Sequence, residues 1–250
     1  AHWLRSFGAT VVSGLDSLVI NSAGQPVVTG TSGASQAVVA AFDALGNPLA
    51  VLYPGTSALS LAAGRNGEVY AVGGGTGFLA IKYGPAFNEL WRTTATASGT
   101  ALRATVDATA NLVMTGSFNV PSSGGGFGAT VVTYNWRTVQ LNTAGATLGS
   151  ADFGYPHFTM GQPAALALGM DGSVLVTGRS AEPMTNTSGA VGYGQSMTTL
   201  KYTGAGVLAG THYVSTSSSG ADVEVAGDGG VHVVGEGNLL TGAPAPLLHF

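Results

Sequence analysis

The sequence predicts an all-β fold built from repeated units, and two observations carry this prediction. First, only 8% of the 250 residues are charged, whereas 45% are apolar and 40 are glycine, so short apolar segments alternate with turn residues. Second, the chain has two lysines, Lys82 and Lys201, and each stands directly before a tyrosine, in IKY and LKY. Lysines at the same place in two similar segments indicate that the chain is made of copies.

Five segments share the first part of the repeat. Each is a run of strand length, mostly rich in β-branched residues and closed by glycine: GQPVVTG (24–30), GEVYAVG (67–73), ANLVMTG (110–116), GSVLVTG (172–178) and GGVHVVG (229–235). Each follows another short apolar run across a turn rich in Asn, Asp and Gly, which reach positive φ at little cost. Each pair therefore predicts a tight β-hairpin.

A third and a fourth strand complete the repeat. The predicted third strands end at Phe42, Tyr83, Leu141, Tyr202 and Phe250. Lys82 and Lys201 are equivalent positions of two third strands. A turn and a fourth strand follow, as in NELWRTTATA (88–97) and GVLAGTHYV (206–214).

The spacing of the copies predicts a β-propeller. The closing glycines stand at 30, 73, 116, 178 and 235, so the basic interval is 43 residues, and four strands in about 40–45 residues are typical of a propeller blade. The N-terminal HWLRSFGATVV is similar to a fourth strand, so we expect one domain of five blades, four antiparallel strands each, whose closing blade is shared by the N- and C-terminal strands. The expected blades are about 15–57, 58–99, 100–162, 163–220, and 221–250 together with 1–14.

At this level the repeat resembles a known family. The motif KY-x-x-x-G, as in KYTGAG, and the turn and strand DGSVLVTG are similar to the bacterial β-propeller repeats named for seven-bladed propellers. The resemblance runs through all five copies, although the motifs are degenerate and the family has seven. It implies a propeller fold and an extracytoplasmic location, and it implies no reaction.

Two intervals between closing glycines are longer than the basic one. They are 62 and 57 residues, and the extra residues fall mainly between the second and third strands of blades 3 and 4. The link between these blades, 152–163, is also long. We expect the three expansions, 117–136, 152–163 and 179–196, to be loops on one face of the ring, and long loops on a regular scaffold often carry function.

The expanded segments are rich in aromatic residues. Six residues of these segments are candidates for a shallow recognition surface: Phe127, Trp136, Tyr155, His157, Phe158 and Tyr193. The alternative is that the aromatic rings pack the insertions onto the ring as a small core.

A second candidate site consists of carboxylates. The first strands are expected to line the channel, and Asp16, Asp222 and Glu224 lie on those of blades 1 and 5. Glycoside hydrolysis needs two carboxyl groups about 5–9.5 Å apart. The alternative is that these side chains bond backbone amides at the start of a blade.

Several function classes have little support. The net charge of −4 with scattered Lys and Arg disfavours a nucleic-acid surface, no apolar run is long enough for a membrane helix, and there is no cysteine. His2, His232 and His249 fall in the composite blade but lack a neighbouring carboxylate at a metal-ligand spacing, so we expect neither a metal nor a cofactor.

These observations favour a non-catalytic, exported binding or assembly module. It is expected to recognise a glycan or a protein subunit through the loops of blades 3 and 4, and to form part of a larger assembly. The alternative is a glycoside hydrolase or lyase that uses Asp16, Asp222 and Glu224.

Overall fold

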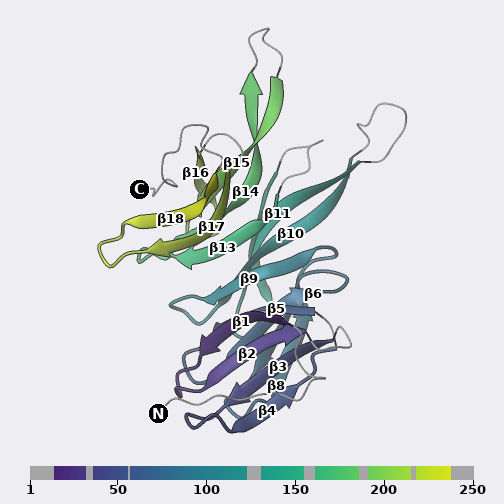
Figure 1. Cartoon of the computed structure of the whole chain (residues 1–250), viewed down its shortest axis with the longest axis vertical. Coiled ribbons are helices and arrows are strands. Elements are labelled where there is room, and N and C mark those ends of the chain that lie inside the picture. Colours follow the sequence, from purple (N-terminus) through teal and green to yellow (C-terminus); the bar gives the residue numbers. More distant parts are fainter. Residues whose placement is uncertain are drawn as a thin grey trace. The chain divides into compact units, whose positions relative to one another are not determined.

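A computed structural model describes residues 14–31, 36–55, 57–122, 131–154, 161–185, 191–214 and 218–237. All regular structure in these ranges is β-strand, and each strand pair whose register is established is antiparallel, so the prediction of an all-β, antiparallel fold is confirmed (Figure 1). The strands are β1 (Gly14–Ile20), β2 (Pro26–Thr31), β3 (Ala37–Phe42), β4 (Pro48–Leu52), β5 (Ser57–Ala63), β6 (Val69–Gly74), β7 (Leu79–Tyr83), β8 (Glu89–Thr94), β9 (Thr100–Val106), β10 (Leu112–Ser122), β11 (Val131–Leu141), β12 (Thr147–Phe153), β13 (Pro163–Leu168), β14 (Val174–Thr185), β15 (Val191–Tyr202), β16 (Leu208–Val214), β17 (Ser218–Val225) and β18 (Val231–Gly237).

The strands follow the predicted repeat. Copy 1 is β1–β4 and copy 4 is β13–β16, and each is a four-stranded sheet in sequence order. Copy 2 (β5–β8) and copy 3 (β9–β12) belong to one larger sheet, which is joined where Gly74 of β6 pairs with Thr100 of β9. Copy 5 comprises β17 and β18. These sheets do not show a closed ring of five blades, and residues 1–13 and 238–250, which were expected to complete copy 5, lie outside the described residues.

The chain forms two compact units. The first contains residues 1–114 and 140–148, and the second contains residues 115–139 and 149–250. Each unit is described by itself below.

One turn type recurs throughout both units. In the described ranges, nine turns have a first residue whose backbone N–H donates to the carbonyl oxygen four residues on; they begin at Asn21, Asp43, Gly64, Gly84, Asp107, Asn142, Gly169, Thr203 and Ala226. The fourth residue of each turn has a positive φ, and it is glycine in all but two, Phe87 (58°) and Ala110 (66°). Five of the nine connect a first to a second strand, which confirms the five predicted hairpins.

The closing glycines of copies 1, 2, 4 and 5 have a structural reason. The register of the first strand shifts at residues 16, 59, 164 and 221, and each of these bulges lies beside the closing glycine of the second strand. A Cβ atom at Gly178 would lie only 2.7 Å from Cα of Pro163, and one at Gly235 would lie 2.7 Å from Sδ of Met197. Glycine is therefore required where the bulged strand or a neighbouring side chain comes close.

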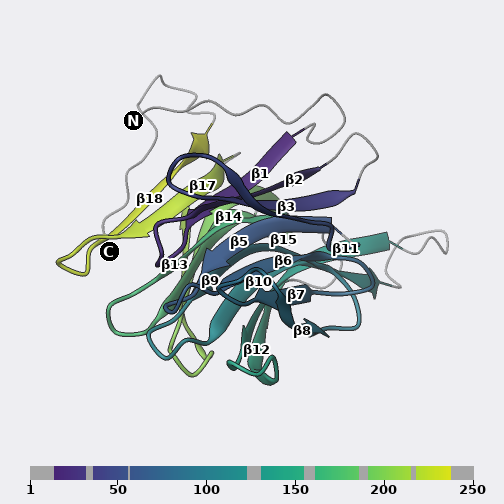
Figure 2. The ribbon, with the colours of Figure 1, turned by 90° about the horizontal axis from the view of Figure 1, so that it is seen from below.

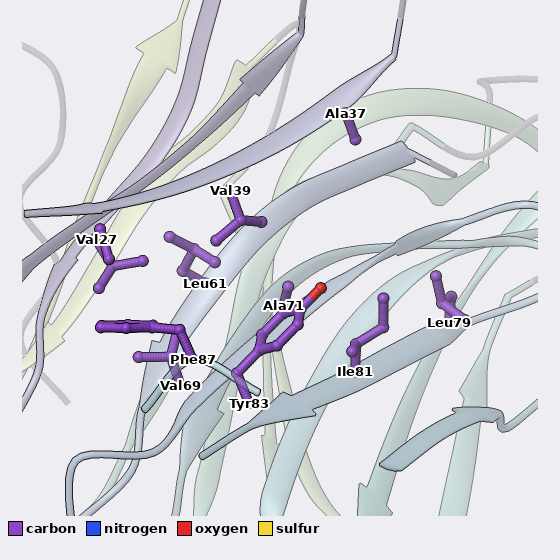
Figure 3. Packing of buried hydrophobic residues seen from close by; sticks show 11 residues of the cluster. Val27, Ala37, Val39, Leu61, Val69, Ala71, Leu79, Ile81, Tyr83 and Phe87 are labelled. Carbon is purple, nitrogen blue, oxygen red and sulfur yellow. The ribbon is translucent and has the colours of Figure 1, made fainter. Parts of the chain in front are cut away.

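Each unit has a hydrophobic core between successive copies. In the first unit the sheet of copy 1 lies over the sheet of copy 2 (Figure 2), and Val27, Val39, Leu61 and Ile81 meet between them (Figure 3). In the second unit, Leu175 and Met197 of copy 4 pack against the β17–β18 hairpin of copy 5.

Candidate functional site

Copies 3 and 4 carry elongated hairpins in place of the loops that the sequence led us to expect. The strands β10 and β11 have 11 residues each and β14 and β15 have 12, whereas β2, β3, β6 and β7 have 5 or 6. The hairpins β10–β11 and β14–β15 are called the copy 3 arm and the copy 4 arm. In Figure 1 the copy 4 arm extends past the ends of β13 and β16, and its strands pair without interruption from Val174–Tyr202 to Thr185–Val191. Much of each insertion is thus regular strand.

Both arms are fixed to the same short segment of the second unit. The indole Nε1 of Trp136, in β11, donates a 2.8 Å hydrogen bond to the carbonyl oxygen of Gly161. The backbone N–H of Arg179, in β14, donates to the carbonyl oxygen of Gln162 at 3.2 Å. Residues 161 and 162 therefore connect the base of the copy 3 arm to the base of the copy 4 arm.

Trp136 does not form part of an exposed recognition surface. Its side chain is only 1% exposed, and its ring packs against Phe153 at a tilted angle with centroids 5.8 Å apart. The prediction that Trp136 contacts a ligand is therefore wrong. For this residue the alternative interpretation holds, in which an aromatic ring packs the insertion onto the scaffold. A large ring with a polar edge suits this position because its N–H finds a partner when buried.

A charged group braces the base of the copy 3 arm. The guanidinium of Arg137 lies 4.1 Å above the ring of Phe118 and donates two hydrogen bonds to the carboxylate of Asp152, at 2.5 and 2.6 Å. These hydrogen bonds raise the pKa of Arg137 above its ordinary value. A bidentate pair that also stacks on an aromatic ring holds β10, β11 and β12 together.

The structure does not describe the side chains of the other five candidates for the recognition surface. Phe127, Tyr155, His157 and Phe158 lie outside the described residues. Tyr193 belongs to β15, where its backbone pairs with Pro183, and its side chain is not described.

The carboxylate candidates are exposed on first strands. Asp16 is exposed on β1 in the first unit, and Asp222 and Glu224 are exposed on β17 in the second. Oδ1 of Asp222 accepts a hydrogen bond from the backbone N–H of Val223 at 2.9 Å, as the structural alternative anticipated. Glu224 pairs with His232 across the hairpin. Among the side chains that the structure describes, no group of three His, Asp or Glu could hold a metal ion.

The two lysines occupy equivalent positions with different surroundings. Lys82 pairs with Trp91 of β8, and Lys201 pairs with Gly210 of β16. The Lys82 ammonium lies 3.4 Å from Glu68 and 5.2 Å from the ring centre of Tyr70, and Tyr70 packs against Trp91 with ring centroids 5.9 Å apart. The Lys82 side chain is 9% exposed.

The surroundings of Lys201 are open. Its side chain is 48% exposed, and its ammonium lies 3.3 Å from Asp171, whose side chain is 63% exposed. Hydrogen bonds from Ser173, together with the Lys201 ammonium, lower the pKa of Asp171 to about 2.

A cavity lies beside Lys201, and its volume is about 330 Å³. It is named the Lys201 pocket, and its lining residues are Leu175, Thr199, Lys201, Gly210, Thr211, His212, Gly229 and Val231. A smaller hollow of about 200 Å³ shares Leu175, Lys201, Gly229 and Val231 and reaches Asp171. The repeat pattern alone did not predict this pocket, although an alignment of the copies places Gly210 where copy 2 has Trp91.

Comparisons with known proteins show likeness in fold only. No protein-family model matches the chain, and neither does any curated protein. Among solved structures, a protein of unknown function from Bacteroides caccae is 16% identical, with a TM-score of 0.50 over 90% of this chain and 72% of that chain. BamB from Moraxella catarrhalis is 12% identical, with a TM-score of 0.47 over 94% of this chain and 73% of that chain. The WD40 β propeller domain of Doa1 is also 12% identical, with a TM-score of 0.43 over 91% and 78%.

The described residues include no helix long and apolar enough to span a membrane.

Proposed function

We propose that this protein is a non-catalytic, extracytoplasmic binding or assembly module, whose copy 3 and copy 4 arms bind a protein subunit. The observation that carries the proposal is that both arms are elongated and both are fixed at their bases to residues 161–162. Two hairpins whose bases bond to the same segment can present a common surface to a partner. The location follows from the resemblance to bacterial propeller repeats.

The arms offer backbone hydrogen-bonding groups to a partner. Residues 180–185 and 191–196 of the copy 4 arm form ladder pairs only with each other within the described chain, since β13 pairs with β14 up to Gly178 and β16 pairs with β15 from Met197 onward. Each strand of the arm therefore has a free edge. Free edges bind extended polypeptides by strand addition, which favours a protein partner over a glycan.

The scaffold for these arms is proposed to be a five-bladed propeller closed by a composite blade. Support comes from the face of copy 1 that does not meet copy 2. Leu18 on this face is 62% exposed, whereas its equivalents Leu61 in copy 2 and Val223 in copy 5 are 3% and 6% exposed because a preceding copy covers them. A preceding blade over copy 1 would complete the same packing.

A shortened copy 4 arm tests the proposed function. Ser180 and Ser196 are partners in the ladder, so replacing residues 181–195 by Asn-Gly joins them through a two-residue hairpin turn and leaves the rest of the sheet intact. Leu45→Ser, in an exposed turn of copy 1, is the control.

The wild type and the two variants are immobilised. The amount of partner protein that each retains is measured, and so is the amount of each glycan in a panel. Retention of a protein by the wild type and the control but not by the shortened arm supports the proposal. Equal retention by all three contradicts it, and loss of glycan retention alone assigns the arms to a glycan. Release of sugar products that is lost in Asp222→Asn would establish the hydrolase alternative.

A further inference from the structure

Three copies share a position where the third strand faces the fourth. Ala41 pairs with Ala50, Lys82 with Trp91 and Lys201 with Gly210, and in each copy the register shifts at the next residue. The three pairs are therefore structurally equivalent, and their different sizes can be compared directly.

In copy 1 both residues of this pair are small, and an aromatic ring from the next copy packs in the same cluster. Ala41 and Ala50 pack in one cluster with Phe87, which lies in the turn that begins at Gly84 of copy 2. Figure 3 shows the ring of Phe87 beside Val27 and Val69. Phe87 is 7% exposed although its φ is positive, so burial of the ring outweighs the backbone strain.

In copy 2 the arrangement is reversed. Trp91 of copy 2 itself supplies the ring, and the residue of copy 3 equivalent to Phe87 is Gly145, where a Cβ atom would lie 3.1 Å from the indole. Nε1 of Trp91 donates to the carbonyl oxygen of Thr143 in the same turn at 2.9 Å. One aromatic ring thus fills the position in each of these two places.

Copy 4 lacks a ring at this position among the described residues. Gly210 replaces Trp91, Leu175 replaces Tyr70, and a Cβ atom built on Gly210 would have no other atom within 4 Å. The resulting space is the Lys201 pocket of about 330 Å³. Its size falls in the range of ligand pockets, which is about 300–1,000 Å³.

We propose that the Lys201 pocket is a binding site for an aromatic side chain, Trp or Tyr, of a partner polypeptide. Leu175 and Val231 provide an apolar floor for the ring. The Lys201 ammonium is complementary to the negative face of an aromatic ring, as the Lys82 ammonium is to Tyr70 in copy 2.

The polar rim of the pocket suits the same ligand. Thr199, Thr211 and His212 line it, and the exposed Thr211 hydroxyl can accept a hydrogen bond from a ring that carries an N–H or O–H group. Gly210 lies in β16, an edge strand of its sheet, so the backbone of a partner can lie alongside while its ring enters the pocket. The pocket lies in the second unit, at the base of the copy 4 arm, and its lining includes no described residue of the projecting part of that arm, residues 180–196.

N-acetyltryptophanamide is a direct probe of the pocket. Titration of the ¹⁵N-labelled full chain should give saturable shifts at Lys201, Gly210 and Thr211, while N-acetylglycinamide gives none. Lys201→Met should weaken binding several-fold, and Leu45→Ser should leave it unchanged.

Gly210→Trp gives the decisive comparison, because it supplies from β16 the ring that Trp91 supplies in copy 2. This variant should lose probe binding and unfold at a higher denaturant concentration than the wild type. Binding that survives in both Gly210→Trp and Lys201→Met would overturn the proposal. If an aromatic residue of the chain's own undescribed segments fills the pocket, the wild type will not bind the probe and Gly210→Trp will be destabilised, which also overturns it.

Discussion

Lys82 and Lys201 have the same register position in copies 2 and 4, yet one side chain is 9% exposed and the other 48%. The residues beside them explain the difference. Lys82 is enclosed by Tyr70 and Trp91, whereas the corresponding residues next to Lys201 are Leu175 and Gly210. Both lysines keep an acidic partner, so the ion pair is common to both copies and the aromatic ring is what differs.

This comparison shows how a repeated fold acquires a site. The backbone register is unchanged between the two copies, and two side-chain replacements change a filled position into a pocket. The strands that surround the pocket are paired in their own sheets, so the space at Gly210 does not depend on a ring there.

The largest effect is expected where a ring fills the equivalent position. Phe87→Ala removes a buried ring from the cluster that contains Ala41 and Ala50 and keeps the positive φ, so it should lower the free energy of unfolding by about 3 kcal/mol. Denaturant unfolding followed by circular dichroism measures this loss. A loss below about 1 kcal/mol would show that the ring is not needed at this position.

The next effect compares two equivalent leucines. Leu61→Ala should cost about 2–3 kcal/mol, because Leu61 is buried between copies 1 and 2. Leu18→Ala should cost about 2 kcal/mol as well if a preceding blade covers copy 1, as we propose. A cost for Leu18→Ala within about 0.5 kcal/mol, which is usual for an exposed residue, would contradict a covered face.

A smaller difference should separate the two lysines. Lys82→Met leaves the partly buried Glu68 without its cation and should cost about 1–2 kcal/mol, less than the loss from a fully buried pair. Lys201→Met should change stability by less than about 0.5 kcal/mol, because the ion pair with Asp171 is exposed. Equal costs in the two variants would show that burial does not distinguish the copies.

The smallest effect depends on pH. Burial alone would raise the pKa of Glu68, but the backbone N–H of Asn66 and the Lys82 ammonium lower it below the ordinary 4.5. A lowered pKa in the folded state stabilises the protein above about pH 4.5, and this contribution disappears as the pH falls through the folded pKa.

Glu68→Gln, which keeps an acceptor for Asn66, isolates this contribution. The wild type should be more stable than the variant at pH 7 by up to about 1 kcal/mol, and the two should converge below about pH 4. Unfolding midpoints at pH 7, 5 and 3.5 measure the difference. A gap that stays constant with pH would contradict the role of the Glu68 charge.

Local features of the sequence predicted the hairpins well. Asn21 and Asp107 stand at the start of turns because their carboxyl or amide oxygens accept hydrogen bonds from backbone N–H groups two and four residues on. The closing glycines were found as a repeat, and the structure adds the bulge that requires them. Short-range chemistry determines these features, so they can be read from one copy at a time.

Features that depend on pairing between strands were missed. The segment 181–185, AEPMT, has the composition of a loop and contains Pro183, yet it pairs residue by residue with β15. The sequence left two roles open for Trp136, ligand contact and packing of an insertion, and the structure shows the packing role. The Lys201 pocket exists because Gly210 has no side chain. That Gly210 is equivalent to Trp91 follows from the strand register, in which each pairs with a lysine of the third strand.

The closed ring that we propose needs all copies to pack by one scheme, in which copy 5 would cover the exposed face of copy 1. Val27 of copy 1 and Leu61 of copy 2 meet in the first core, and by register the proposed equivalent pair would be His232 and Leu18. The chain has no cysteine, so the double variant His232→Cys, Leu18→Cys gives a clean test under mild oxidation. We expect a disulfide within one monomer at low protein concentration, detected by mass spectrometry of the digested chain. Thiols that stay free, or disulfides that form only between molecules, would contradict the closed five-bladed ring.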